Sequence, residues 1–304
     1  MAKKTRRTTA KKKPARSSGP EIPVGVRRAL IVFTIVVLTA VLIGLGLERV
    51  RRYVNDRPGY RVDLNRVTVL EKPRWLSDAD VRAMSAAAGL TGSRGFFEPD
   101  LEQEVRESWS RSPILSRTPD VARIHPNRVA LTLRVRRPVA VVYDYANAAE
   151  PLILVDREGV RWPGRFGEVP VRFGKLPVIT GVDPTLRTPR AGSNAWGDVR
   201  VRHGVAVAVD LLRGLPARLA AELEIGGISI SNVGTTEPQK PEIVLEIRDG
   251  IAVEWGRSSA SEHAGREIPV ETKIAHLDEA CRSPGLERVK ILRVQYDKLG
   301  FVER

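Results

Sequence analysis

Four histidines and one cysteine are the residues of this sequence best suited to metal binding or nucleophilic chemistry. The histidines lie far apart, and none forms an H-x-x-x-H or His–Cys pair with the spacing of metal ligands. Motifs of serine nucleophiles and phosphate-binding loops, such as G-x-S-x-G and S-x-x-K, do not occur either. We therefore expect no catalytic residue, no metal and no cofactor. The residues considered are His125, His203, His263, His276 and Cys281.

The cysteine and three of the tryptophans are most simply interpreted as core residues. Cys281 lies on the apolar side of a helix expected at 270–281 and has no visible activating partner, which disfavours a reactive thiol. Because it is the only cysteine, no intrachain disulfide can form. Trp162, Trp196 and Trp255 are expected to fill the core in preference to binding sugar, since tryptophan buries a large apolar area.

The longest apolar segment lies at residues 29–47, ALIVFTIVVLTAVLIGLGL, and contains no charged or amide side chain. As a helix it would be roughly 28 Å long, close to the hydrocarbon thickness of a bilayer. Arginines precede it, and charged residues with Tyr53 follow it, as at the two interfaces of a membrane. A cleaved signal peptide would have a shorter core and a cleavage site, and a buried soluble helix would have a polar face. We predict one transmembrane helix.

Residues 1–28 hold ten Lys and Arg but a single acid, Glu21. This composition predicts a disordered tail attracted to lipid headgroups, with nucleic-acid binding or docking of a cytoplasmic partner as open alternatives. Six Lys or Arg lie within twenty residues on each side of the segment 29–47, so the positive-inside count is tied. Since long domains are exported with little regard to charge, we expect the tail in the cytoplasm and the C-terminal part outside. The remaining chain is only mildly basic, and we expect no nucleic-acid binding there.

Residues 48–60 are expected to form a linker, and residues 61–137 a small domain. Ser77 and Asp100 have side chains that commonly cap helix N-termini, and Gly89 is placed to end the first helix. The resulting order of strand, helix, helix, strand, strand predicts a compact α+β domain with helices on one face of a small sheet. The expected elements are a strand within 62–69, a helix from Ser77 to about Ala88, a helix after Asp100, and strands at 121–124 and 128–136.

Residues 138–304 change to short strands and turns. The clearest hairpin signal is Asp249-Gly250, because both turn residues tolerate positive φ. Gly300 to Val302 are expected to extend the last strand or to pair back on it. We predict a mixed, largely antiparallel β domain with flanking helices. The expected strands are 152–155, 160–162, 223–230, 242–248, 251–255 and 291–296, and the expected helices are 198–212, a turn after Pro216, and 270–281.

Several short segments match motifs of one known protein family. Each match is weak alone, but together, in the order given below, they are fairly specific. The segments are Arg123-Ile124-His125-Pro126-Asn127-Arg128-Val129, Arg136-Arg137-Pro138-Val139-Ala140, residues 154–160, residues 176–181, and Leu292-Arg293-Val294-Gln295-Tyr296-Asp297. In these segments, and in its order of tail, apolar helix and two domains, the chain resembles the FtsQ/DivIB family of cell-division proteins. The resemblance implies a POTRA domain at 61–137 and an FtsQ-type β domain at 138–304.

The chain departs from the family pattern at three places. Residues 71–75 stand where the first POTRA strand is normally followed by a Gly-Asn-type turn. Pro113-Ile114-Leu115 takes the place of a common Pro-Trp-Val, with residues 116–120 added, and a polar insert occupies 257–266. These departures leave the edges of the POTRA docking surface open.

The resemblance implies protein binding in place of chemistry. In the family the last strand is where the partner FtsB docks, and the tyrosine that matches Tyr296 contributes to the contact. A strand at a sheet edge can accept an added strand from another chain. The alternative is that Tyr296 and Phe301 only close the core at the chain end. The expected contact row is Arg293, as a rim charge, with Val294, Tyr296, Gly300 and Phe301.

The expected function is that of a non-enzymatic scaffold at the bacterial division septum, anchored in the inner membrane. The resemblance implies that it binds FtsB and FtsL and, through them, FtsW and FtsI of septal peptidoglycan synthesis, with no small-molecule substrate. A membrane-anchored extracytoplasmic enzyme, such as a cell-wall hydrolase, is the rival class, and it would need a carboxylate pair or a nucleophile in a pocket. A POTRA chaperone for outer-membrane assembly is a weaker alternative, because no barrel segments follow.

Overall fold

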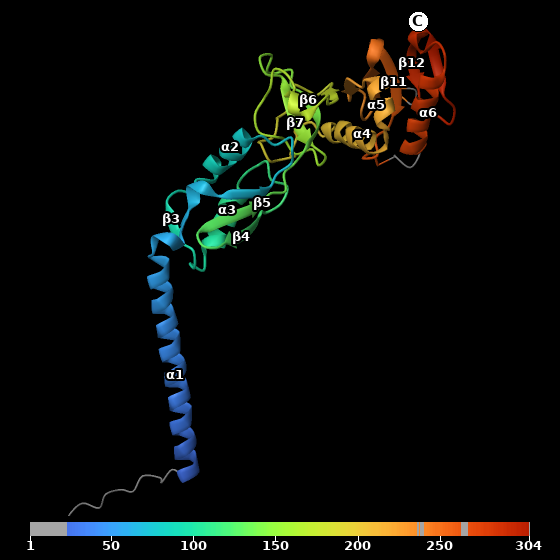
Figure 1. Cartoon of the computed structure of the whole chain (residues 1–304). Helices are drawn as coiled ribbons and strands as arrows, with labels where there is room; N and C mark the ends of the chain where they lie inside the picture. The colour runs from blue at the N-terminus through green and yellow to red at the C-terminus, as the bar shows by residue number, and fades with distance from the viewer. Residues whose placement is uncertain (1–22, 236, 238–239, 263–266, 304) are drawn as a thin grey trace, which may run out of the picture. The chain divides into compact units, whose positions relative to one another are not determined.

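The computed structural model describes residues 23–235, 237, 240–262 and 267–303 (Figure 1). The chain divides into two compact units, residues 1–60 and residues 61–304. Most of the predicted disordered tail, residues 1–22, lies outside the described residues. The predicted class, mixed α+β with one apolar N-terminal helix and a sheet-rich body, is confirmed.

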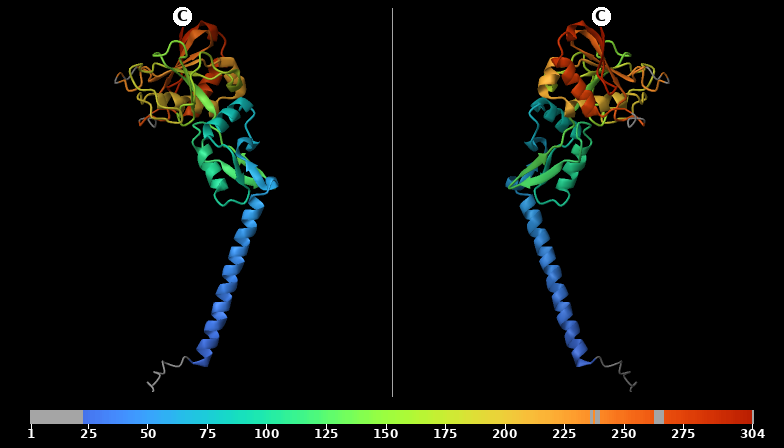
Figure 2. Two further views of the ribbon diagram at one scale, coloured as in Figure 1. Left: turned by 90° about the vertical axis from the view of Figure 1, so that its left-hand side faces the viewer. Right: turned by 90° about the vertical axis from the view of Figure 1, so that its right-hand side faces the viewer.

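The first unit is dominated by the helix α1, Val24–Asn55, which both views of Figure 2 show as one continuous rod. By length and composition it could cross a membrane, and its apolar side chains are exposed and not packed inside the protein. The helix extends beyond the apolar run 29–47 at both ends, since residues 24–28 and 48–55, expected in the tail and the linker, are also helical. The cause is that the arginines and Glu48 flanking the apolar run are themselves good helix formers.

Two threonines inside α1 have partners within the helix. The hydroxyl of Thr34 donates to the carbonyl oxygen of Leu30, and that of Thr39 donates to the carbonyl oxygen of Ile35, each at 2.8 Å. Both hydroxyls are therefore satisfied without water, which a helix in hydrocarbon requires. Within the expected linker, the short 3₁₀ helix η1, Pro58–Tyr60, follows α1.

The second unit begins with a three-stranded sheet in the order β2-β5-β4 and a separate two-stranded pair, β1-β3. Strand β2 runs parallel to β5, and β4 runs antiparallel to it. Elements β2, α2, α3, β4 and β5 follow the predicted order of strand, helix, helix, strand, strand, and two strands that were not predicted, β1 before β2 and β3 between the helices, are added to it. The bounds are β1 Arg61–Asp63, β2 Thr68–Glu71, α2 Asp78–Ala88, β3 Ser93–Gly95, α3 Leu101–Ser110, β4 Asp120–Ile124 and β5 Arg128–Thr132.

The single strand predicted within 62–69 is wrong, because a 3₁₀ turn, η2 Leu64–Arg66, divides it. The carboxylate of Asp63 accepts a hydrogen bond from the backbone N–H of Asn65 at 3.0 Å and so caps this turn. Strand β5 is also shorter than predicted. Its continuation stays extended and pairs with a loop, since Arg136 N–H donates to the Ile114 carbonyl at 2.9 Å.

The two helices of this part begin differently. Ser77 caps α2 as predicted and also forms a reciprocal capping box with Asp80, and Gly89 ends α2 in the left-handed conformation at φ 66°. Asp100 precedes α3, but its side chain makes no capping hydrogen bond. Its backbone is already helical, at φ −90° and ψ −3°, whereas a capping residue is normally extended. The predicted Asp100 cap is therefore wrong.

The rest of the second unit is built on an eight-stranded sheet in the order β13-β12-β11-β10-β9-β8-β6-β7. Four pairs of neighbouring strands are antiparallel. The other three are parallel, namely β6-β8, β8-β9 and β11-β12, so the sheet is mixed and largely antiparallel. The bounds are β6 Pro138–Tyr143, β7 Leu152–Asp156, β8 Val178–Thr180, β9 Gly227–Ser229, β10 Ile243–Ile247, β11 Ile251–Gly256, β12 Val289–Arg293 and β13 Gly300–Glu303.

Three helices, α4 Val201–Gly214, α5 Ala217–Leu223 and α6 Val270–Arg282, share one apolar core with this sheet. A row of side chains in register crosses five strands, and each of its members is 0 % exposed. Helix α4 lies close to the sheet at Gly204, where a Cβ would be 2.9 Å from Ile179 Cγ2. The row is Ile179, Ile228, Leu245, Val253 and Leu292.

The hairpin predicted at Asp249-Gly250 is confirmed, with φ of 60° and 69° at the two turn residues. The strand predicted at 223–230 is shorter, because Leu223 is the last residue of α5. The strand predicted at 291–296 ends at Arg293, and β13 pairs back on it.

Candidate functional site

The eight-stranded sheet has two outer strands, and the chain itself covers one of them. Outside β7, Leu152 and Phe166 exchange backbone hydrogen bonds at 3.0 and 2.9 Å, and Trp162 N–H donates to the Leu154 carbonyl at 2.8 Å. This segment occupies the backbone groups that an added strand would need. Edge β7 is thus closed to strand addition.

The opposite edge, β13, has no further strand beside it in the described part of the chain. Val294 N–H donates to the Glu254 carbonyl of β11 at 3.2 Å, so the backbone groups of Arg293, one residue earlier, point toward β13. Arg293 is paired with Gly300. Because the direction alternates from residue to residue, the N–H and C=O of Phe301 point away from β12. They are placed to receive another strand.

The structure separates the five residues of the predicted contact row. Val294 is 0 % exposed and belongs to the core, so its side chain cannot contact a partner. Val294 directly follows β12, which is not an edge strand because it lies between β11 and β13. Gly300 and Phe301 are on the true edge strand, and Tyr296 lies in the connection between β12 and β13. The side chains of Tyr296 and Phe301 are 50 % and 45 % exposed.

Arg293 projects from the sheet face opposite the helices, whereas Phe301, the partner of the buried Leu292, projects from the face that carries the helices. The Nε of Arg293 is 3.0 Å from Glu254 Oε2, and the arginine side chain is 47 % exposed. Gln295 Nε2 donates to the same carboxylate oxygen at 3.3 Å. Sequence reasoning missed Glu254, although the alternation along β11 places it on the face opposite Val253. The candidate site therefore consists of the open backbone edge of β13 with the exposed ring of Phe301, the exposed Tyr296 in the preceding connection, and Arg293, held by Glu254 on the other sheet face.

The other candidate residues are not brought together. No group of three or more His, Cys, Asp or Glu could hold a metal among the described residues, and His263 lies outside them. Burial raises the pKa of the Cys281 thiol, which favours its unreactive form. Trp162 and Trp255 are buried as predicted, and Trp196 is half-buried with its Nε1 donating to Gly159.

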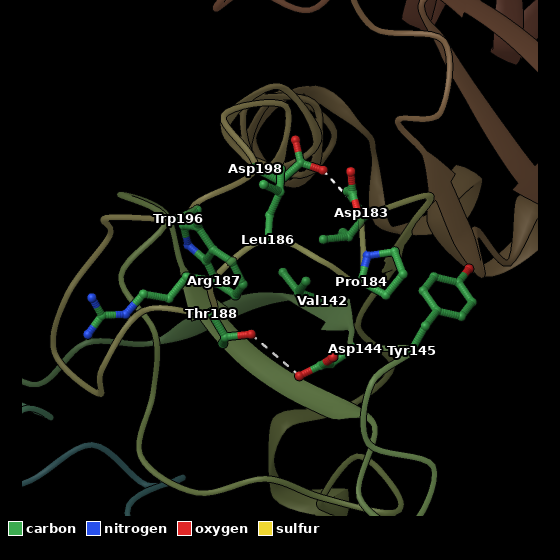
Figure 3. Close-up of a pocket in the computed structure, with 11 residues that line it drawn as sticks. Val142, Asp144, Tyr145, Asp183, Pro184, Leu186, Arg187, Thr188, Trp196 and Asp198 are labelled. Carbon is green, nitrogen blue, oxygen red and sulfur yellow. Dashed lines mark hydrogen bonds between the residues drawn. The ribbon is translucent and has the colours of Figure 1, made fainter.

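A small pocket surrounds Val142 and contains three carboxylates (Figure 3). Its volume is about 10 Å³, which is room for about one water molecule. Asp144 and Asp198 are already paired, with Arg165 at 2.6 Å and with Arg200 at 2.7 Å. The pocket offers no room for a substrate.

Comparison with known proteins adds no family assignment: no protein-family model matches the chain, and no match is found among curated proteins. The open edge at β13 is therefore the feature of the fold that bears most directly on function. The apolar helix α1, long enough to cross a membrane, is the second supporting observation.

Proposed function

We propose that the protein is a single-pass membrane scaffold of the FtsQ/DivIB type that captures a partner by strand addition at β13. The observation that carries the proposal is the asymmetry between the two sheet edges. The chain covers β7 with its own backbone, whereas β13 leaves the Phe301 N–H and C=O outward and its ring 45 % exposed. Proteins normally protect an open edge unless it is used.

The small α+β part at residues 61–137 is proposed to be a POTRA domain. The supporting features are its three-stranded sheet, β2-β5-β4, and the two helices inserted between β2 and β4. The rest of the second unit would be the FtsQ-type β domain. Each part on its own is only a fold, so the assignment rests on the sequence resemblance together with this order of elements.

The proposed partners are FtsB and FtsL and, through them, FtsW and FtsI of septal wall synthesis. Helix α1 would place the protein in the inner membrane with its N-terminus in the cytoplasm and residues 61–304 outside, at the septum. Confinement of all partners to one membrane raises their effective concentration, so weak strand addition would suffice for assembly. No chemistry of its own is required for this role.

Strand addition would use three features of the β13 edge. Outward backbone groups at Phe301 would supply main-chain hydrogen bonds, which give affinity without depending on sequence. The ring of Phe301 and the half-exposed Tyr296 would be covered by the partner, which adds apolar burial. Arg293 would face a carboxylate at the rim and favour an acidic partner residue.

The test is co-purification of the detergent-extracted full chain with FtsB and FtsL. We expect Phe301→Glu and Tyr296→Glu to abolish capture, because each places a charge in the contact. Val171→Glu is the matched control, since Val171 is 95 % exposed and lies far from β13 in sequence. Phe301→Pro is a second test, because it removes the ring together with an N–H that the fold does not use and adds no charge, and edge strands tolerate such a proline.

Wild-type capture that both glutamate variants lose, with unfolding temperatures unchanged, supports the edge mechanism. If both glutamate variants and Phe301→Pro bind like the wild type, β13 is not the docking strand. If the wild type captures neither FtsB nor FtsL, the scaffold assignment itself is wrong.

A further inference from the structure

A groove of about 380 Å³ lies in the second unit, away from the β13 edge. It is lined by residues from both of its parts, including Val135 from the small α+β part and Leu212 from α4. Its volume is at the lower end of the range for ligand sites, about 300 to 1,000 Å³. It can therefore hold a few side chains but not a folded domain.

One side of the groove is apolar. Val139 and Val209 are buried there, and Val135 is half-buried. Leu212 stands out because it is 62 % exposed, whereas its neighbour in sequence, Leu211, is 5 % exposed and belongs to the core. An exposed leucine beside three valines gives a docked molecule apolar surface to cover.

The rim of the groove is positively charged. Arg137, Arg157 and Arg213 line it, are exposed, and make no hydrogen bond or ion pair with another described residue. The two acids of the lining form their ion pairs with a fourth arginine, Arg136, and the charge of Glu158 also attracts Arg157 without a hydrogen bond. Arg136 Nη1 lies 2.6 Å from Asp156 Oδ2 and 2.8 Å from Glu158 Oε2.

The pairing with Arg136 also keeps Glu158 ionised. The hydrogen bond from Arg136 holds the pKa of the Glu158 carboxyl below its usual range. Arg136 and its two carboxylates together carry a net charge of −1, and Arg137, Arg157 and Arg213 bring the lining, with four arginines and two acids, to a net charge of +2. The free charge of the groove is positive.

We propose that this groove docks an acidic segment of another protein, with its apolar side chains against Leu212 and Val135 and its carboxylates on the three free arginines. A free phosphate or a lipid headgroup could use the guanidinium groups, but it would leave Leu212 in water. The basic N-terminal tail of this chain is excluded as occupant by its charge. The site is independent of the β13 edge, so the scaffold proposal and this one can fail separately.

The probe is a fluorescein-labelled peptide of about twelve residues with Glu and Leu at helical spacing, and its binding to the detergent-extracted full chain is measured by anisotropy. We expect Arg137→Glu, Arg157→Glu and Arg213→Glu combined to weaken binding more than about tenfold. We expect Leu212→Ala to weaken it about threefold to tenfold, because an apolar contact of about 1 kcal/mol is lost.

Two matched controls separate site binding from general attraction. Arg74→Glu, Arg128→Glu and Arg288→Glu combined make the same change of charge at exposed arginines outside the groove. Leu70→Ala removes a leucine that is 54 % exposed on β2. Both controls should bind the peptide like the wild type, and all variants should keep the wild-type unfolding temperature.

A second peptide with Ser in place of Leu, and inorganic phosphate as competitor, test the class of ligand. The Ser peptide should bind several-fold more weakly. Phosphate should not displace the Leu peptide when the ionic strength is held constant with another salt. Equal binding of the two peptides, displacement by phosphate, or equal loss in the two triple variants would each overturn the proposal.

Discussion

Phe301 lies directly opposite Leu292 on the neighbouring strand, yet Leu292 is 0 % exposed and Phe301 is 45 % exposed. The two residues end a row that crosses the sheet from Ile179 and is otherwise fully buried. The row therefore continues past the edge of the core. A strand added beside β13 would cover the part of the Phe301 ring that is exposed in this fold.

This relationship predicts unequal costs for two truncations. Leu292→Ala should lower the free energy of unfolding by about 2 to 5 kcal/mol, because it leaves a cavity in a closed core. Phe301→Ala should lower it by only about 1 to 2 kcal/mol, since half of the ring already meets water. Denaturant unfolding of the full chain in detergent measures both, and equal losses would place Phe301 in the core instead of at an interface.

Alanine substitutions of Arg136 and of its neighbour Arg137 should change the free energy of unfolding by different amounts. The Arg136 guanidinium contacts Asp156 and Glu158, and its Nε donates to the Leu115 carbonyl at 3.1 Å. Arg136→Ala should lower the free energy of unfolding by about 3 kcal/mol, because Asp156, 4 % exposed, loses its cation. Arg137→Ala should change it by less than about 0.5 kcal/mol, since Arg137 is exposed and unpaired. Similar losses at both positions would contradict the role of the ion pair.

Local patterns in the sequence predict those parts of the fold that local forces decide. The apolar run gives α1, and Asp249-Gly250 gives its hairpin because both positions need positive φ. Asp63 shows the limit of this reasoning. Its side chain closes a turn with Asn65 and divides an alternating segment that reads as one strand.

The edge of the sheet depends on contacts between distant segments, and alternation cannot reveal it. Val294 has the apolar pattern of a strand, but whether that strand is outermost depends on β13 pairing back on β12. The groove is hidden for the same reason. Arg137, Arg157 and Arg213 are scattered in sequence, and only the fold brings them to one rim.

Alanine substitutions at the N-termini of α2 and α3 should lower the stability by unequal amounts. Ser77 accepts a hydrogen bond from the backbone N–H of Asp80 at 3.1 Å, so Ser77→Ala should lower the free energy of unfolding by about 1 kcal/mol. Asp100→Ala should have less than half of that effect, because the Asp100 side chain caps nothing. Thermal unfolding of the two variants measures both effects. An equal loss of stability would mean that Asp100 caps α3 in solution.

The protonation of His203 should make the stability of the protein depend on pH. The Nδ1 of His203 lies 2.7 Å from the Ser258 hydroxyl, and burial, followed by the charge of Arg202, lowers the pKa of the imidazole. The attraction of Glu242 opposes this shift without reversing it. The unfolded chain, with a histidine pKa of about 6.5, therefore binds the proton first. The contribution of neutral His203 is complete above that pH and is lost as the pH falls toward the lower pKa of the folded state. His203→Gln should thus flatten the fall of the unfolding free energy below about pH 6.5, and an unchanged slope would remove His203 as the cause.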